Sequence, residues 1–340
     1  MNDPLASTGR AHVRDADALL AQGRRIEAVA ALQTACRVRP EWGRERDLVR
    51  LRCAAFADLD RSLRPPWPPA VPDARAEASG PPVVTAAELT PALLQRGVLR
   101  HGSVWARGLV PPNRVDRLVE AIDRAFDAHD ACARGGGHSP WFDPLEEIPE
   151  GEAMRGWIRD GGGVLAADSP RGLHAFLDAI EAVGIRALVA AYLGEPPALS
   201  AEKCTLRRIE PGPSRASWHQ DGAFLGAGIR TLNAWIALSD CGRDAPGLDL
   251  IPLRLDHLLA TGEEGAIFDW AVSPATIARE LPGVPIWRPE FRAGDVLFFD
   301  HLCLHRTASD EGMSASRHAI ESWFFAPSVY PIGSQTPILV

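Results

Sequence analysis

Two histidines and one aspartate in this chain have residue types and a spacing that could hold a metal ion. His219 and Asp221 lie two residues apart in the run WHQD, and His305 follows later within GDVLFFDHLCLHRT. Side chains at positions i and i+2 of an extended segment point to the same side, so both could reach one ion. Two neutral imidazoles and one carboxylate on one face of a metal form the facial triad of non-haem Fe(II) oxygenases. The HxD tripeptide alone is weak evidence, because such runs arise by chance in many proteins.

The elements that must position these residues are short strands. After Ser200, apolar side chains recur with a period of two, in runs separated by Gly/Pro turns. Strands are expected at Lys203–Ile209, Thr231–Leu238, Leu248–Ile251, Asp295–Phe299 and His318–Phe325. Several short strands of this kind are typical of a jelly-roll sandwich or barrel. Because helical periods come first and strands later, the pattern predicts an α+β fold.

Helical periods dominate the first two hundred residues. Helices are expected over Asp15–Val38, Arg44–Leu59, Thr85–Gly97, Pro111–His129 and residues 171–193, with a short strand over Val98–Val104. In Thr85–Gly97, Thr85 has the place of an N-cap and Glu88 that of its capping-box partner. A stretch without period, residues 132–168, is rich in Gly, Pro and acid. Such stretches in compact domains are usually functional loops.

This irregular stretch contains large side chains that need something to cover. Trp141, Arg155 and Trp157 favour a loop that closes over a substrate, with Arg155 available for an anionic group. The alternative is a surface loop held by its own aromatic residues.

The N-terminal residues look like a separate helical unit. The run AQGRRIEAVAALQTACRVRP resembles the second half of a tetratricopeptide repeat. Only one repeat is visible, so the unit is either a hairpin packed on the main domain or a peptide-binding module. We expect a tetratricopeptide-like hairpin over residues 1–63, a proline-rich linker over 64–84 with few contacts across it, and the main domain over 85–340.

Four motifs in order resemble the phytanoyl-CoA dioxygenase family of Fe(II)/2-oxoglutarate oxygenases. They are QRGVLRHGSVWARGLVPPNRVDRLVEAI, WHQDG, NAWIALSD with APGLDLIP, and GDVLFFD…LHRT…SRHAIESWFF. The resemblance implies a double-stranded β-helix core of the cupin-like, jelly-roll type with flanking helices and an N-terminal helical extension. It also implies iron ligation by His219, Asp221 and His305. The family's usual turn after APGLDLIP is replaced here by LRL, which leaves substrate contacts open.

The resemblance extends to the cosubstrate. Arg317 matches the arginine that binds the distal carboxylate of 2-oxoglutarate, Thr307 a hydroxyl that assists it, and Trp235 an aromatic residue of the pocket. A guanidinium suits this role because its planar donors grip a carboxylate in two places. Alternation in TLNAWIAL puts Asn233 on the same inner face as Trp235, so Asn233 either donates to the cosubstrate or only caps a strand edge.

Four charged or polar neighbours leave alternatives open. Glu321 lies four residues after Arg317 and could pair with it in a structural salt bridge. His301 would lie on the same side of an extended segment as His305 and is therefore a second candidate ligand, although we interpret it as structural. Lys203 and Arg207, on the strand before the metal motif, could reach an anion, but solvated edge charges are the simpler interpretation.

These observations predict an Fe(II)- and 2-oxoglutarate-dependent dioxygenase that uses O2, hydroxylates a small organic molecule, and releases succinate and CO2. One rival is a metal cupin without O2 chemistry, against which Arg317 argues. A related halogenase would lack the carboxylate ligand that Asp221 provides. The third rival is a catalytically inactive interaction protein that binds a partner through residues 1–63.

Composition excludes several other classes. The chain has 36 Lys+Arg and 44 Asp+Glu among 340 residues, a net charge of −8. Such a chain is a poor candidate for binding nucleic acid. No apolar run approaches the length of a membrane span, and the N-terminus lacks a secretory core. Six widely spaced cysteines without a CxxC pair suit reduced thiols, so we expect a cytoplasmic enzyme.

Overall fold

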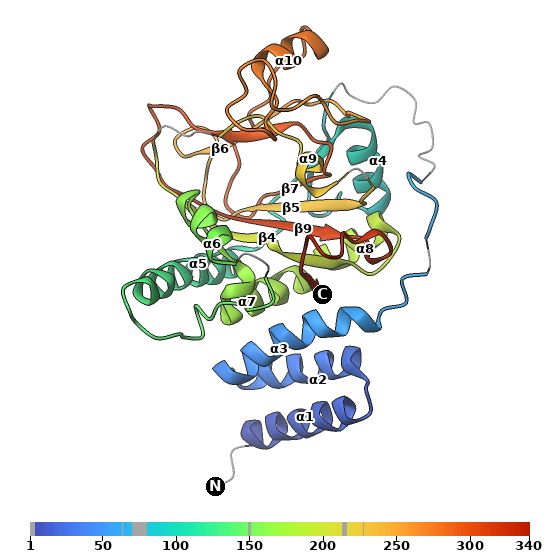
Figure 1. Ribbon diagram of the computed structural model, residues 1–340, viewed down its shortest axis with the longest axis vertical. Coiled ribbons are helices and arrows are strands. Elements are labelled where there is room, and N and C mark those ends of the chain that lie inside the picture. Colours follow the sequence, from blue (N-terminus) through green and yellow to red (C-terminus); the bar gives the residue numbers. More distant parts are fainter. Residues whose placement is uncertain (1–3, 63, 70–79, 149–150, 213–215, 227) are drawn as a thin grey trace.

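An eight-stranded sheet lies at the centre of the computed structural model (Figure 1), which describes residues 4–62, 64–69, 80–148, 151–212, 216–226 and 228–340. The strands are β1 (Val83–Thr85), β2 (Ser103–Arg107), β3 (Gly163–Leu165), β4 (Ala198–Ile209), β5 (Thr231–Ala237), β6 (Gly247–Leu250), β7 (Val296–Phe299), β8 (His305–Ala308), β9 (Arg317–Phe325) and β10 (Pro337–Leu339). The large sheet has the order β1-β2-β7-β5-β9-β4-β10, with β3 paired to β4, and only β1–β2 is parallel. A second, two-stranded sheet joins β6 and β8 antiparallel.

The large sheet is buried on both faces, and the predicted period of two separates them. On β5, Leu232, Ala234 and Ile236 belong to the core shared with the helices, whereas Trp235 and Ala237 belong to a second core on the opposite face. That second core also holds residues of β6, β7 and β9, so it is the inside of the jelly roll. The predicted α+β, jelly-roll fold is confirmed.

Ten α-helices lie around these sheets within the described residues. They are α1 (Pro4–Ala21), α2 (Arg25–Val38), α3 (Trp42–Ala55), α4 (Pro91–His101), α5 (Pro112–Ala133), α6 (Gly151–Asp160), α7 (Pro170–Ala182), α8 (Ile185–Leu193), α9 (Gly222–Leu225) and α10 (Pro274–Glu280), with 3-10 turns η1 (Phe56–Asp58), η2 (Ala166–Asp168) and η3 (Pro327–Val329). Helices α5, α7 and α8 cover the outer face of the sheet (Figure 1), because their apolar stripes face it. None of the described helices combines the length and hydropathy needed to cross a bilayer.

The prediction for residues 85–104 is wrong in its boundaries. Glu88 does accept hydrogen bonds from the Thr85 amide and hydroxyl, but the segment between them is only a turn. The helix α4 begins at Pro91, because Thr90 caps it by accepting from the Leu93 amide. It continues to His101, so the strand β2 starts five residues later than the expected Val98.

Residues 132–168 are more ordered than the lack of period indicated. They contain α6, β3 and η2. Phe142, Leu145 and Ile158 are buried in the outer core, which they share with the helices. The prediction of a stretch without secondary structure is therefore wrong, because a ten-residue helix is too short to show a clear period.

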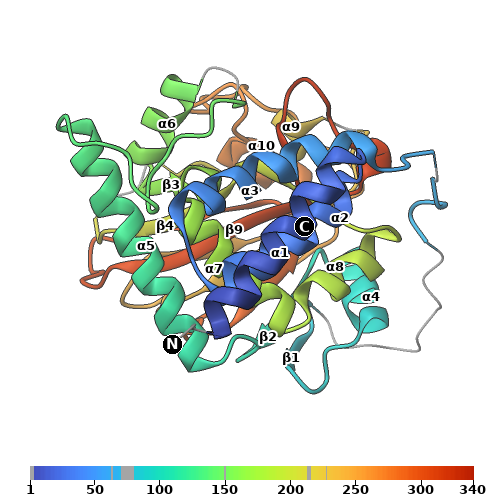
Figure 2. The same ribbon diagram turned by 90° about the horizontal axis from the view of Figure 1, so that it is seen from below.

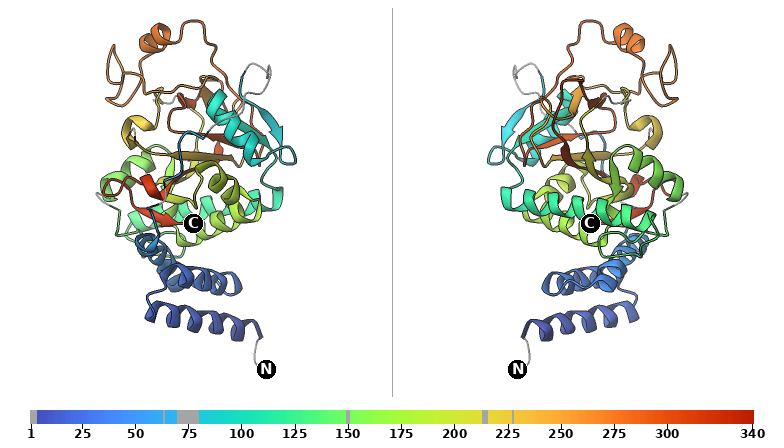
Figure 3. Two further views of the ribbon diagram at one scale, coloured as in Figure 1. Left: turned by 90° about the vertical axis from the view of Figure 1, so that its right-hand side faces the viewer. Right: turned by 90° about the vertical axis from the view of Figure 1, so that its left-hand side faces the viewer.

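Residues 1–63 contain three α-helices rather than a two-helix hairpin, and these stack in one layer at the bottom of the molecule (Figures 1 and 3). Helix α1 packs on α2 and lies outermost, while α3 lies against α7 and β10 (Figure 2). The expectation of few contacts with the main domain is wrong. Arg52 donates to the carbonyl oxygen of Leu339, and Glu45 pairs with Arg171 at 2.8 Å. Ten of the residues of the expected linker, 70–79, lie outside the described residues.

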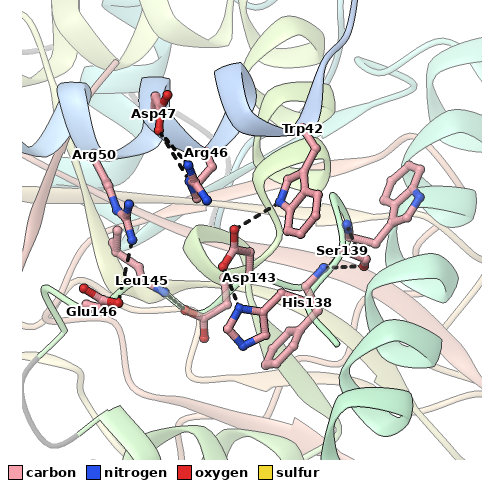
Figure 4. Close-up of polar contacts among 12 residues, drawn as sticks. Trp42, Arg46, Asp47, Arg50, His138, Ser139, Asp143, Leu145 and Glu146 are labelled. Atoms are coloured by element: carbon pink, nitrogen blue, oxygen red, sulfur yellow. Dashed lines mark hydrogen bonds and ion pairs between the residues drawn. The ribbon is translucent and has the colours of Figure 1, made fainter. Parts of the chain in front are cut away.

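Helix α3 also contacts the segment that leads into α6. Trp42 Nε1 donates to Asp143 Oδ2 at 3.0 Å, and His138 Nδ1 lies 3.1 Å from the other oxygen of the same carboxylate (Figure 4). Asp143 is 7% exposed, so these two contacts supply partners for a buried carboxylate. The N-terminal helices thus help to fix residues 138–143.

Candidate metal centre and cosubstrate site

His219 and His305 face each other as an antiparallel pair. Each backbone amide donates to the other residue's carbonyl oxygen at 3.0 Å, which makes an isolated bridge at the start of β8. Directly paired residues carry their side chains on one face of the ladder. The two imidazole rings are therefore only 4.4 Å apart between centroids, although 85 residues separate them along the chain.

Asp221 completes the cluster through a turn. It is not extended, as the i, i+2 argument assumed, but has φ −60° and ψ −25° at the start of α9. The outcome is nevertheless the predicted one, because Asp221 Oδ2 lies 3.5 Å from His305 Nε2. One ligand atom from each of the three residues falls within 4.8 Å of the others.

Gln220 and Gly222 hold this turn in place. The buried Gln220 side chain donates to the carbonyls of His257 and Leu302 and accepts from the Leu259 amide. A Cβ on Gly222 would lie 2.8 Å from Leu258 and 3.0 Å from the His301 ring, so a larger residue after the aspartate would have to displace both side chains. The residues of WHQDG therefore position the carboxylate as well as supply it.

The three side chains fit a divalent metal ion. His219 Nδ1 donates to the carbonyl oxygen of Ser217 and His305 Nδ1 to that of Cys303, which leaves both Nε2 lone pairs free for a metal. Burial, together with the neighbouring His305, lowers the pKa of His219 to about 4, so the neutral ligand form prevails. Asp221 Oδ2 is buried without a hydrogen-bond partner. A cation would satisfy that oxygen.

His301 has a different environment. Its Nδ1 lies 3.1 Å from the Thr231 hydroxyl, and its carbonyl oxygen accepts from the Gly222 amide. The chain turns between β7 and β8, so the parity shared by His301 and His305 does not bring their rings together. Among the described residues, the metal cluster contains His305 and not His301.

Arg317 is a buried cation at the first residue of β9, on the inner face. It is 0% exposed, and its Nη1 donates to the carbonyl oxygens of Pro246 and Gly247. Its Nε and Nη2 are buried without partners in the described structure. Glu321 does not neutralise it, because that carboxylate pairs with Arg207 at 2.8 Å. The structural salt bridge considered above is therefore absent from the described contacts, and the guanidinium lacks an anion.

Of the other expected cosubstrate residues, Trp235 and Thr307 lie beside Arg317 or its contacts, whereas Asn233 lies further along β5, paired with Trp323. Its Cζ lies 5.4 Å from the ring centroid of Trp235, whose buried Nε1 also lacks a partner. Thr307 pairs with Leu248 on β6, next to the Gly247 carbonyl that Arg317 contacts. Asn233 is 2% exposed, and its Oδ1 accepts from the Ser322 amide. A dicarboxylate fits the unpartnered donors of Arg317 and Trp235.

The three expected substrate residues lie elsewhere. Arg155 makes three hydrogen bonds to Asp168 and the Leu145 carbonyl oxygen, so the prediction that it is available for an anion is wrong. Trp141 lies under the guanidinium of Arg171 on α7. Trp157 is 55% exposed on α6. That these residues contact a substrate stays a prediction.

Sequence reasoning missed an aromatic group beside the metal cluster. The Trp270 ring lies edge-on to His219 at 5.4 Å, and Phe268 stacks on Trp270 at 4.9 Å and an interplanar angle of 6°. Phe224, on α9, lies 6.3 Å from His219. Lys203, which we interpreted as a solvated edge charge, has its Nζ 4.0 Å from the Phe224 ring centroid. The long irregular segment around Trp270 has no period that could have indicated this position.

Several solved structures are similar to this chain at low sequence identity. EctD from S. alaskensis with 2-oxoglutarate and 5-hydroxyectoine has a TM-score of 0.50 and 18% identity, with 75% of this chain and 86% of that chain covered. The epimerase SnoN with Fe3+, alpha ketoglutarate and nogalamycin RO has a TM-score of 0.44 and 18% identity, over 69% and 83%. EvdO2 from Micromonospora carbonacea var. aurantiaca with 2-oxoglutarate has a TM-score of 0.45 and 14% identity, over 73% and 91%.

The comparison of sequences identifies the family directly. No curated protein matches the chain significantly. The family model for phytanoyl-CoA dioxygenase matches residues 98–319, which include the strands β2 to β8, the histidine–aspartate cluster and Arg317. That match covers more than half of the chain; it includes the two middle motifs of the resemblance in full and most of the first and the last. The chain therefore belongs to the phytanoyl-CoA dioxygenase family of Fe(II)- and 2-oxoglutarate-dependent oxygenases.

Proposed function

We propose that this oxygenase hydroxylates a small organic molecule at a centre formed by His219, Asp221 and His305, with 2-oxoglutarate bound through Arg317. One observation carries the proposal. A three-residue metal cluster and a buried, unneutralised guanidinium lie on the same inner face of the jelly roll. The two sites need complementary partners, a cation and a carboxylate.

The residues of the chain have separate tasks in this function. Iron bound at the cluster supplies the redox chemistry that couples O2 and 2-oxoglutarate to substrate oxidation, with release of succinate and CO2. The carbonyl oxygens of Ser217 and Cys303 fix the tautomers of the two histidines. Trp235 and Thr307 border Arg317, so that a bound dicarboxylate is held at one end while the other end stays free to reach the metal.

The inner face also excludes water from the reaction. Phe299 lies 4.8 Å from the His305 ring and packs edge-on against Trp323 at 5.7 Å. Both side chains are at most 3% exposed. A dry wall strengthens the electrostatic contacts within the site and keeps solvent from a reactive centre.

The experiment that tests this function measures succinate. The purified full-length chain, loaded anaerobically with Fe(II), is given 2-oxoglutarate and O2 with and without a library of small organic molecules. We expect succinate in stoichiometric amounts with an oxidised library member. Binding of Fe(II) without any succinate would contradict the proposal and leave a metal site with another chemistry.

We also propose the domain division of residues 1–63, 64–84 and 85–340, with a protein contact through the first unit. The family match begins after this unit, at residue 98. Its helices form a separate apolar cluster, to which Leu339 alone is contributed from the rest of the described chain. Helix α1 contacts mainly α2 within the described part of the chain, and we place the partner on its far side.

A further inference from the structure

Lys203, the only lysine of the chain, lies beside the metal cluster rather than at an edge. On β4, Leu199 and Ala201 belong to the outer core, and so do Cys204 and Leu206. The step from 201 to 204 is three residues instead of two, where the register with β9 shifts. This bulge turns Lys203 away from the helices and toward Phe224 of α9, three residues after Asp221.

Lys203 forms no ion pair in the described part of the chain, although the carboxylates of Asp221 and Glu321 are near enough to interact with it electrostatically. Its one close contact there is the face of Phe224, a cation–π interaction. Its neighbour two positions along the face, Thr205, is neutral. The next, Arg207, already shares the carboxylate of Glu321. The ammonium group is only partly exposed, so solvent alone compensates it incompletely.

When the charges of Fe(II), 2-oxoglutarate and the side chains around them are added, Lys203 is not needed to balance any of them. Fe(II) and Arg317 together balance Asp221 and the 2-oxoglutarate dianion, and Arg207 balances Glu321. The buried carboxylate of Glu202 accepts from the Thr336 amide and forms no ion pair with Lys203. Lys203 remains, on the side of the metal cluster where the aromatic rings gather. This step rests on the proposed function, because the sum includes Fe(II) and 2-oxoglutarate.

The aromatic rings beside Lys203 form a partly open apolar surface. Phe224 is 39% exposed and Phe268 36%, while Trp270 lies between them, 6.2 Å from Phe224 and stacked on Phe268. The segment that carries Trp270 is tied to the metal motif, since the Val272 amide donates to the Trp218 carbonyl oxygen at 2.8 Å. Large exposed aromatic side chains at a site favour a ligand with a flat, apolar body.

We propose that the primary substrate is an organic anion with a planar or apolar body. Its acidic group pairs with Lys203, and its body lies on the surface formed by Phe224, Trp270 and Phe268. Lys203 is then a substrate-binding residue that selects by charge, and the aromatic surface orients the bound molecule toward the metal.

The test compares two probes of the same shape, 3-phenylpropanoate and 3-phenylpropanamide, by anaerobic calorimetry on the full chain loaded with Fe(II) and 2-oxoglutarate. We expect the wild type to bind the acid about tenfold or more tightly than the amide, the effect of one charge-assisted contact. Lys203→Met should bring the two affinities within about twofold, and Lys203→Arg should restore the preference. Phe268→Ala should weaken both probes alike. Arg124→Met, on the exposed side of α5, is the matched control and should change neither.

Two results would overturn the inference. The first is equal binding of acid and amide by the wild type, or binding of neither. The second is weaker binding of 2-oxoglutarate to Lys203→Met, because the lysine would then serve the cosubstrate. Succinate formed from 2-oxoglutarate without any probe reports on the proposed function separately, so either result can occur while that function stands.

Discussion

Replacement of Arg317 by methionine separates a cosubstrate-binding arginine from a structural one. The side chain has two unpartnered donors, Nε and Nη2, and no carboxylate in the described structure. Loss of a two-point, charge-assisted contact should cost about 2–4 kcal/mol, which is about 30- to 1000-fold in the Kd for 2-oxoglutarate. Arg317→Lys should be intermediate, since the charge survives but the fork geometry does not. The assay is anaerobic titration of 2-oxoglutarate, followed by absorbance of its iron chelate.

The thermal stability of the metal-free, cosubstrate-free protein supplies the second measurement. Arg317 is a buried charge without a counter-ion, so its replacement should leave Tm unchanged or raise it. Arg230 is the matched control, because it is also buried, at 4% exposed, but has a carboxylate partner, Glu195 at 3.2 Å. Arg230→Met should lower stability by about 3 kcal/mol and leave 2-oxoglutarate binding unchanged. Normal cosubstrate binding by Arg317→Met, or a loss of stability like that of Arg230→Met, would refute the reasoning.

Three further predictions concern the metal, pH and the N-terminal helices. His219→Ala and Asp221→Ala should each abolish iron binding in a folded protein, whereas His301→Ala should keep its iron; metal analysis checks this. Burial lowers the pKa of His174 to about 4 from 6.5, so the unfolded chain binds the extra proton between these values and stability falls as pH drops through that window. Across that window the free energy of unfolding should change by about 3 kcal/mol. His174→Leu should reduce this change, which denaturant titrations at pH 7 and pH 4.5 measure. Removal of residues 1–63 should lower Tm by several degrees, because it uncovers β10 and α7, but iron content should persist.

For each of these three predictions, one experimental result would contradict it. Iron loss in His301→Ala alone would make that residue the ligand. An acid sensitivity that His174→Leu retains in full would assign it to other groups, such as the pairs around Asp178 and Arg37 near the same ring. Truncated protein that folds without binding iron would show that the N-terminal layer positions the metal centre at a distance.

The alternation of residues along strands was predictable because it reflects one local rule. On β5, the alternation placed Trp235 correctly on the inner face, opposite Leu232, Ala234 and Ile236. Burial on both faces did not obscure the pattern, because polar residues and tryptophan mark the inner face. The pairing of His219 with His305 was not predictable by any local rule. It depends on a bridge across the jelly roll, which only the order of the family motifs indicated.

Local signals failed where two of them competed. Thr85 and Glu88 form their capping-box contacts, yet a second cap at Thr90 and a proline at the next position start the helix later. The structure of residues 132–168, which show no sequence period, was predicted wrongly for a related reason. Asp143 has its partner Trp42 on α3, more than a hundred residues earlier, and Trp141 has Arg171 on α7, about thirty residues later. No short window of sequence contains such a residue together with its partner.

The bulge on β4 shows why the position of Lys203 was the hardest to foresee. A strict period of two from Leu199 would place Lys203 on the outer face, among the helices, where a charge without a partner would be strongly disfavoured. One extra residue between Ala201 and Cys204 reverses that placement and brings the ammonium group to Phe224 instead. The bulge therefore converts a residue that would destabilise the outer core into one that can bind an anion at the metal centre. Bulges are features that re-aim side chains at sites, and this one is explained by the single cation that it moves.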